Sequence, residues 1–315
     1  MKNLNKIAII AILFIVTVTL AGCEALPGNL SSDGTGELTM FIADKPVNNV
    51  AEVNVTLEKV EIHEEEAGWI TLTDFADDGG EKTFDLLKLR FDEELLGQKQ
   101  IAVGTYNQIR LIVAADKENQ AGAGNYSGKS YVRYNDDSTE DIFIPSGVQT
   151  GLKINHEFII EDNEVKRLVL DNNVAEIMHS AGKSGKIILR PTAIEVIDKL
   201  ISGNVEGYVL ADINDDGSNE VITKYDVIVE ALNENDEIVK STVADNEEGK
   251  FLLRGLEEGE YTINAYAVDN TEDKNKVYEL PVTQNPGGEE EINISITADQ
   301  TTTLENNIIL EPITQ

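Results

Sequence analysis

Cysteine and histidine are both scarce in this sequence. Its 315 residues include one cysteine, Cys23, and three histidines, His63, His156 and His179. A single cysteine cannot form a disulfide within the chain, so burial and hydrogen bonding must stabilise the fold. The histidines lie far apart, and no second histidine follows His63 at the spacing of a zinc-protease motif. A zinc centre built from histidines is therefore not expected.

Basic residues are also few relative to acidic ones. The chain has 25 Lys and Arg residues against 58 Asp and Glu residues, which gives a formal net charge of −33. Such a surface repels nucleic acid, because proteins bind nucleic acid by neutralising its phosphates with Lys and Arg. It also repels anionic lipid headgroups. Two explanations of the acidity stay open: an ion-rich setting, in which carboxylates keep the surface hydrated, and the binding of divalent cations.

Long hydrophobic runs are lacking except near the N-terminus. There Ile7–Leu20 is apolar apart from Thr17 and Thr19, and it follows a short basic segment with Lys2 and Lys6. A membrane-spanning helix needs about 20 apolar residues, so this run is too short to cross a bilayer. A basic segment, a short apolar run and then small residues are typical of a secretory signal peptide.

The apolar run ends in Leu20-Ala21-Gly22-Cys23, which resembles the lipobox of bacterial lipoproteins. The resemblance implies that residues 1–22 are a lipoprotein signal peptide, cleaved between Gly22 and Cys23. It also implies that the Cys23 thiol carries diacylglyceryl and palmitate-type chains, and two or more such chains anchor a protein stably. An ordinary secretory signal is the alternative. The expected location is the extracytoplasmic side of the cell envelope: the outer membrane in a Gram-negative source, which Glu24 favours, and otherwise the outer face of the cell membrane.

The remaining chain has the pattern of a tether followed by strands. Residues 23–36 contain Pro, Asn, Ser, Asp and Gly without hydrophobic periodicity, which predicts a flexible tether. From Glu37 onward, apolar and polar residues alternate in short runs bounded by Asp, Asn and Gly, as in half-buried strands. Only Asp92–Leu96 and Val174–His179 indicate short helices. Many short strands at fairly even spacing predict an all-β fold.

Five ordered motifs in residues 37–198 resemble a bacterial lipoprotein module known as domain of unknown function 4382. They are Phe41-Ile42-Ala43-Asp44-Lys45-Pro46, Phe84-Asp85-Leu86-Leu87-Lys88-Leu89, Gly104-Thr105-Tyr106-Asn107-Gln108-Ile109-Arg110-Leu111, Pro145-Ser146-Gly147-Val148-Gln149-Thr150-Gly151-Leu152-Lys153 and Leu189-Arg190-Pro191. The resemblance implies a β-sandwich on the secreted side of the membrane. It implies no activity and no catalytic residue.

Residues 204–315 have a second set of motifs, after a short junction at residues 199–203. Gly249-Lys250-Phe251 and Gly259-Glu260-Tyr261-Thr262-Ile263 resemble the carboxypeptidase regulatory-like, transthyretin-type β-sandwich. This resemblance implies a non-catalytic module that is commonly appended to surface proteins. The sequence therefore predicts two consecutive β-sandwich domains after the signal peptide and tether.

A Gly-x-Tyr triplet precedes an alternating strand in each predicted domain. The triplets are Gly104-Thr105-Tyr106 and Gly259-Glu260-Tyr261. A tyrosine at the start of a strand can bond its hydroxyl to an upstream backbone group, as in the tyrosine corner of immunoglobulin-like sandwiches. We therefore predict a structural role for Tyr106 and Tyr261.

Calcium is the metal ion for which the sequence offers ligands. Residues 212–220 match the first part of a calcium loop, with a glycine, Gly217, where such loops bend sharply. The candidate ligands are Asp212, Asn214, Asp216, Ser218 and Glu220. Thr223 stands where an EF-hand has its bidentate glutamate, so an EF-hand is not expected. A plain acidic turn is the alternative, because Asp, Asn and Gly favour turns.

No catalytic motif stands out. The chain has no Gly-x-Ser-x-Gly elbow, and neighbouring residues in a strand point to opposite faces. The adjacent acids are Asp77 and Asp78, Glu93 and Glu94, and Asp136 and Asp137. We therefore expect a lipid-anchored binding or scaffold protein without catalytic activity. Its expected partners are the membrane, through the N-terminal lipid, and a cell-envelope protein or polysaccharide, but not nucleic acid.

Two alternatives stay open at this stage. A carbohydrate-active hydrolase would need a pocket with two carboxyl groups about 5 to 9 Å apart. A protein-interaction module would need an open sheet edge that accepts a partner strand.

Overall fold

A computed structural model of the chain divides it into two compact units, residues 1–32 and residues 33–315. The structure describes residues 34–45, 50–75, 79–114, 126–144, 150–177, 187–214, 217–269, 276–281, 284, 288 and 291–313. The predicted signal peptide and the lipidation site at Gly22 and Cys23 therefore lie outside the described residues. Where the chain is described, no helix has the length and apolar character needed to span a membrane.

The fold is all-β, as predicted, and consists of two β-sandwich-like parts. The first sandwich contains β1 (Thr35–Lys45), β2 (Val50–Glu64), β3 (Gly68–Asp74), β4 (Lys82–Asp85), β5 (Glu94–Ala102), β6 (Gly104–Val113), β7 (Tyr126–Tyr134), β8 (Thr139–Phe143), β9 (Leu152–Ile160), β10 (Val165–Asn173) and β11 (Ile194–Asp198). Its helical segments are short: η2 (Leu86–Leu89), α3 (Val174–Ile177) and η4 (Pro191–Ala193).

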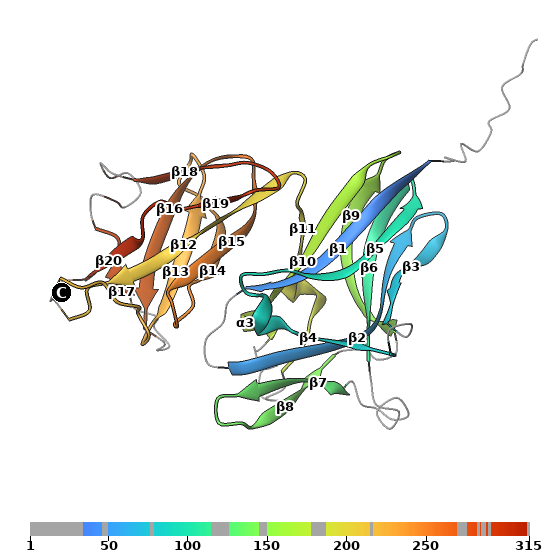
Figure 1. Cartoon of the computed structure of the whole chain (residues 1–315), viewed down its shortest axis with the longest axis horizontal. Helices are drawn as coiled ribbons and strands as arrows, with labels where there is room; N and C mark the ends of the chain where they lie inside the picture. Colours follow the sequence, from blue (N-terminus) through green and yellow to red (C-terminus); the bar gives the residue numbers. More distant parts are fainter. Residues whose placement is uncertain are drawn as a thin grey trace, which may run out of the picture. The chain divides into compact units, whose positions relative to one another are not determined.

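Two sheets enclose the core of the first sandwich (Figure 1). One has the strand order β11-β10-β1-β5, with β1 and β10 parallel, and the other has the order β8-β7-β2-β6-β9. Leu38, Met40 and Ile42 of β1 are buried at every second position and meet side chains from the other sheet in one hydrophobic cluster. Alternate burial along a strand is what places one face on the core.

Strand β2 is the central strand of this sandwich. Its first half pairs with β4 and β7, and its second half pairs with β3 and β6. The core-facing residues are odd-numbered at Val55 and Leu57 but even-numbered at Val60 and Ile62, and all four are buried. The register shift between Leu57 and Lys59 explains this change, because an extra residue in a strand turns the following side chains to the other face.

The helix predicted at Asp92–Leu96 is wrong, because Glu94 begins β5. Leu96 of this strand is buried against the core, while the pairing of β5 with β1 satisfies the backbone. A short apolar run does not distinguish a helix from a strand, and here the neighbouring strand decides. At the second predicted helix, Val174–Ile177 is helical, whereas Met178 and His179 lie outside the described residues.

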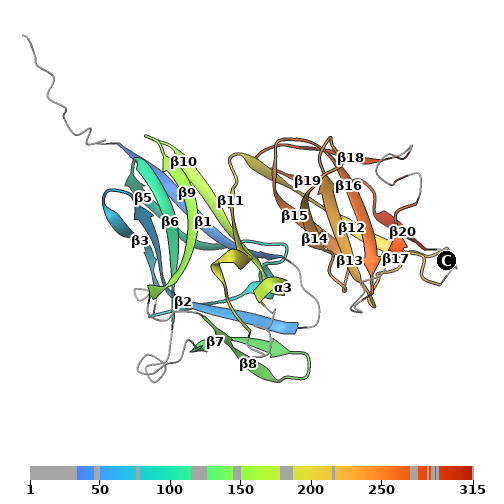
Figure 2. The ribbon, with the colours of Figure 1, turned by 180° about the vertical axis from the view of Figure 1, so that it is seen from behind.

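The second sandwich follows the turn at residues 199–201 (Figure 2). It contains β12 (Ser202–Ala211), β13 (Asp226–Leu232), β14 (Ile238–Val243), β15 (Lys250–Glu257), β16 (Gly259–Val268), β17 (Lys276–Glu279), β18 (Ile292–Ile296), β19 (Thr301–Thr303) and β20 (Ile308–Pro312). The strand order is β14-β13-β16-β17-β20-β12-β15, with β18 beside β16 and β19 beside β12.

Each sandwich has its own hydrophobic cluster. The first cluster draws on residues from Leu38 to Ile194, and the second on residues from Val205 to Leu310. Both sandwiches nevertheless belong to the compact unit of residues 33–315. The division of the chain into separate domains at residues 199–203 stays a prediction.

The predicted tyrosine contacts are present in both sandwiches. The hydroxyl of Tyr106 donates to the carbonyl oxygen of Ala102 at 2.9 Å, and that of Tyr261 donates to the carbonyl oxygen of Glu257 at 3.1 Å. In each case the acceptor lies four residues upstream, at the end of the preceding strand. Burial raises the pKa of Tyr106 to about 12, so this hydroxyl keeps its proton and remains a donor.

Candidate functional site

A bulge in β15 turns one arginine out of the second sandwich. Opposite β12, the register skips Arg254 and Gly255, and Gly255 has a left-handed φ of +70°. The side-chain oxygen of Asn204 accepts the Gly255 N–H at 3.2 Å. A Cβ atom at Gly255 would lie 2.9 Å from the side chain of Ile197, so glycine fits both the conformation and the space. Bulges commonly redirect a side chain, and this one directs Arg254 toward the first sandwich.

The Arg254 guanidinium binds a ring of backbone carbonyls in the first sandwich. Nη1 donates to the carbonyl oxygen of Asp44 at 2.7 Å. Nη2 donates to three further carbonyl oxygens: Leu89 at 3.0 Å, Arg90 at 2.9 Å and Asp92 at 3.0 Å. The side chain is 3% exposed. A buried charge of this kind is tolerated only when hydrogen bonds replace its hydration, and a planar guanidinium supplies donors in the required plane.

Two buried carboxyl groups complete this cluster. Asp44 of β1 and Asp171 of β10 lie on paired parallel strands, and Asp171 Oδ1 is 3.4 Å from Nη1 of Arg254. Burial raises the pKa of Asp44 well above its ordinary value, and the negative charge of Asp171 adds to the effect. Burial also raises the pKa of Asp171, against the attraction of Arg254. Because both carboxyl groups are about 1% exposed or less, the cluster holds the fold together and is closed to a substrate.

Further ion pairs connect the two sandwiches around this cluster. Glu195 of β11 binds Lys45 of β1 at 3.1 Å and also Lys240 of β14. Although burial acts to raise it, the pKa of Glu195 is lowered by these two lysines. Arg167 and Asp299 form a more exposed pair at 2.7 Å. Exposed pairs contribute little, so Arg254 is the principal contact.

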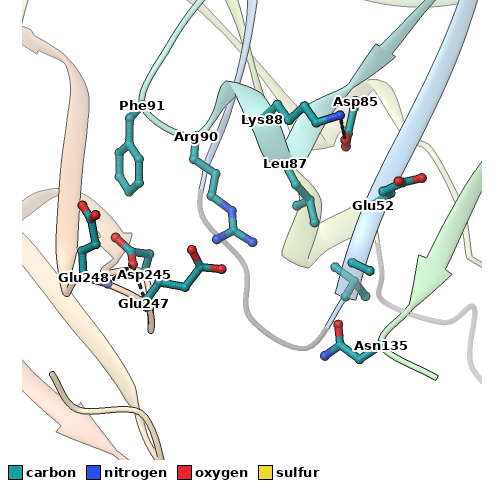
Figure 3. A pocket seen from close by; sticks show the side chains of 12 residues that line it. Glu52, Asp85, Leu87, Lys88, Arg90, Phe91, Asn135, Asp245, Glu247 and Glu248 are labelled. Atoms are coloured by element: carbon teal, nitrogen blue, oxygen red, sulfur yellow. Dashed lines mark hydrogen bonds and ion pairs between the residues drawn. The ribbon is translucent and has the colours of Figure 1, made fainter. Parts of the chain in front are cut away.

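A cleft of 510 Å³ lies beside the contact that Arg254 makes between the two sandwiches, which we call the Arg254 junction (Figure 3). Its lining comes from both sandwiches: Val50, Ala51, Glu52, Asp85, Leu87, Lys88, Arg90, Phe91, Asn135, Asp245, Glu247 and Glu248. Most of its acids already have structural partners. Asp245 accepts the backbone N–H groups of Glu247, Glu248 and Lys250, and Asp85 pairs with Lys88 at 3.2 Å. The cleft therefore combines acidic, basic and apolar side chains, and at least two of its acids, Asp85 and Asp245, serve local structure.

The predicted calcium loop is described at residues 212–214 and 217–220. Gly217 has a φ of +84°, and its N–H donates to Asp212 Oδ2 at 2.9 Å. Glu220 accepts from the Asn214 side chain at 2.7 Å and from the Ile213 N–H at 3.3 Å. Asp216 lies outside the described residues. Among the described residues, including those of this loop, no group of three or more His, Cys, Asp or Glu side chains is placed to hold a metal ion.

The adjacent acids singled out in the sequence take part in local contacts. Asp136 accepts the N–H of Ser138, and Asp137 pairs with Arg133 within the same hairpin. Glu93 pairs with Lys199, and Glu94 with Lys82. Asp77 and Asp78 lie outside the described residues.

Sequence reasoning did not identify Arg254. The available signals were a glycine directly after an arginine in a strand, and Asp44 within one of the quoted motifs. Neither signal indicates which carbonyl groups the arginine reaches, because its acceptors lie 162 to 210 residues away along the chain.

Comparison with known proteins identifies the first part of the chain. Residues 35–191 match the model of the family described as Domain of unknown function (DUF4382), so this segment is a domain of that family. This match confirms the resemblance of the five motifs. No curated protein matches the chain.

Several solved bacterial structures are similar to the chain at low TM-scores. The Bacillus anthracis TIE protein has 14% identity and a TM-score of 0.21, covering 89% of this chain and 35% of its own. The minor pilin GBS52 of Streptococcus agalactiae has 10% identity and a TM-score of 0.24, covering 88% and 97%. The major pilin subunit BcpA of Bacillus cereus has 12% identity and a TM-score of 0.24, covering 88% and 70%. The chain thus spans about a third of the TIE protein.

Replacing Arg254 tests the junction. We expect Arg254→Leu to lower the free energy of unfolding by about 3 to 5 kcal/mol, because it leaves a buried carboxylate and four carbonyls without their donor. The matched control is Arg167→Leu, which breaks the exposed pair with Asp299 and should cost less than about 1 kcal/mol. Urea unfolding measures both. Equal effects would contradict the central role of Arg254.

The buried Asp44 carboxyl predicts an unusual dependence on pH. Its pKa is raised in the folded state, so the folded protein binds a proton that the unfolded chain releases, and this contribution to stability grows as the pH falls toward about 4. We expect the stability of the native protein, relative to Asp44→Asn, to rise over that range. Carboxyl groups with lowered pKa values, such as Glu195, have the opposite trend but cancel in the difference. Urea unfolding of both proteins across pH measures it, and a difference independent of pH would contradict the assignment.

Proposed function

We propose that this chain is a lipid-anchored, extracytoplasmic binding or scaffold protein without catalytic activity. The observation that carries the proposal is the junction at Arg254. A buried guanidinium from one sandwich is bound to four carbonyls of the other, and this contact would hold the two sandwiches in a fixed arrangement. A scaffold protein requires binding surfaces that keep a fixed position relative to each other. An enzyme requires instead an accessible reactive centre.

The anchor itself is inferred from the N-terminal sequence. The lipobox-like Leu20-Ala21-Gly22-Cys23 supports lipidation at Cys23, and the excess of acidic residues disfavours attachment through anionic headgroups. Of the predicted tether, Thr35 and Gly36 belong to β1. Residues 23–34, fully extended at about 3.3 to 3.6 Å per residue, would reach roughly 40 to 43 Å from the bilayer. A cell-envelope protein or polysaccharide would then be the partner, held within reach of the membrane.

Lipidation can be tested by replacing the single cysteine. We expect Cys23→Ala to abolish incorporation of labelled palmitate in a bacterial host and to move the protein from the membrane fraction to the soluble fraction. Ser32→Ala, in the same tether, should leave both properties unchanged. If Cys23→Ala incorporated no palmitate but stayed in the membrane fraction, membrane attachment would not depend on the lipid. This result would not bear on the contact at Arg254.

We also propose that Ca²⁺ binds the loop of Asp212, Asn214, Asp216, Ser218 and Glu220. In support, Gly217 makes the sharp bend, and Asp212 and Glu220 both point their carboxylates at groups of the loop. On binding, Glu220 would exchange its contacts with Asn214 and Ile213 for the cation. Oxygen ligands in a tight loop suit a hard cation such as calcium.

Thermal melting tests the calcium proposal. A ligand that binds only the folded state at 100 times its Kd stabilises that state by about 2.7 kcal/mol, so the Tm should rise with Ca²⁺. We expect Asp216→Ala to remove the rise, and Glu234→Ala, which removes one acid from another exposed turn, to retain it. An unchanged Tm of the native protein at millimolar Ca²⁺ would dismiss the site.

A further inference from the structure

The second sandwich is closed along only part of its length. Strand β16 pairs first with β18 and then with β17, and β12 pairs first with β19 and then with β20. The pairing of β17 with β20, through Tyr278 with Pro312 and Glu279 with Glu311, closes one half. In the other half, among the described residues, β18 pairs only with β16 and β19 only with β12.

A side-chain contact between described residues bridges the open half. The Thr302 hydroxyl donates to the Ser295 carbonyl oxygen at 3.1 Å, close to the turn that connects β18 and β19. Beyond this contact, toward Ile292 and Ile308, the two sides bound a groove of 540 Å³. Its strands can be followed in Figure 2. The volume falls within the range of about 300 to 1,000 Å³ that is common for ligand clefts.

The groove reaches the hydrophobic core. Ile294 and Ile308 belong to the core cluster, and Ile292 and Leu304 pack against it while partly exposed. Amide and hydroxyl side chains surround this apolar floor: Asn293, Ser295, Thr303, Asn306 and Asn307. An apolar floor with polar groups at the rim and strand edges alongside matches an extended peptide, whose side chains point alternately down and up while its backbone forms hydrogen bonds.

Charge restricts the peptide further. Glu291 and Glu305 line the groove, and no Lys or Arg is among the lining residues that the structure describes. The chain as a whole carries a net charge of −33. Peptide side chains that point away from the apolar floor therefore meet negative charge. Basic side chains at these positions would speed association with the groove, whereas acidic peptides would be repelled.

We propose that the groove between β18 and β20 binds an extended segment of a partner protein in which apolar and basic residues alternate. The apolar side chains occupy the floor formed by Ile294, Leu304 and Ile308, and the basic side chains lie toward Glu291 and Glu305. This inference rests on the proposed binding function and identifies its partner chemistry, but it does not depend on the lipid at Cys23.

The test uses the mature chain and a short fluorescent peptide of alternating lysine and valine, at physiological ionic strength. We expect saturable binding in fluorescence anisotropy and at least about tenfold weaker binding to Leu304→Arg, which places a charge on the floor. Ile238→Arg is the matched control: it changes the net charge equally at a side chain that is 58% exposed on β14, and it should bind as the native protein does. Melting temperatures establish that both variants are folded.

A second variant and a second peptide separate the groove from general attraction to an acidic protein. Glu305→Gln should weaken binding of the lysine peptide several-fold, and a peptide of alternating glutamate and valine should not bind. Equal affinity of the native protein and folded Leu304→Arg would overturn the proposal, as would failure of the lysine peptide to bind. Either failure would leave the membrane fractionation of Cys23→Ala unchanged, so the anchor and the groove are judged independently.

Discussion

The buried guanidinium of Arg254 is the contact on which the connection between the two sandwiches depends. This cation is almost completely buried. The free-energy cost of removing it from water is offset only because four carbonyl oxygens and Asp171 surround it. Those carbonyls belong to the end of β1, to Leu89 at the end of η2 and to the residues that follow η2, so the arginine also connects two parts of the first sandwich. Removing it would disturb both sandwiches at the same point.

The backbone conformation at Gly255 and the packing of the first sandwich against it both favour the outward direction of Arg254. Gly255 permits the bulge that directs Arg254 outward, and Ile197 of the first sandwich occupies the space that a Cβ at Gly255 would need. Asp44 and Asp171, by contrast, repel each other when both are charged, and burial raises the pKa of each carboxyl group. Like charges in a dry interior favour the protonated carboxyl, so the junction combines strong hydrogen bonding with a carboxyl group that prefers to be neutral.

Features governed by short-range rules could be predicted from the sequence. Alternation predicted the all-β fold, and the Gly-x-Tyr triplets predicted the contacts of Tyr106 and Tyr261, since each acceptor lies four residues away. The segment at Asp92–Leu96 was assigned wrongly because pairing with β1, and not local preference, makes it a strand. The Arg254 contacts could not be foreseen, because they arise where segments distant in sequence meet. The groove beside β18 lies between segments close in sequence, but it depends on β18 pairing with β16 and β19 pairing with β12, which local sequence patterns do not reveal. The predicted ligands Asp212 and Glu220 do lie in one loop, for they are close neighbours in the chain.

The parallel pairing of β1 with β10 has a consequence for the order of events during folding. Glu37 pairs with Gln100 on one side and with Val165 on the other, so one edge of β1 has to wait for a partner that is made more than a hundred residues later. Contacts of such long range form slowly, because a large loop must close before they contribute. During that interval β5 is the partner in this sheet that β1 can already pair with. Under the proposed lipidation of Cys23, the modifying enzyme would therefore be able to act before this sheet is complete, and β10 would join a strand whose preceding segment is already attached to the membrane.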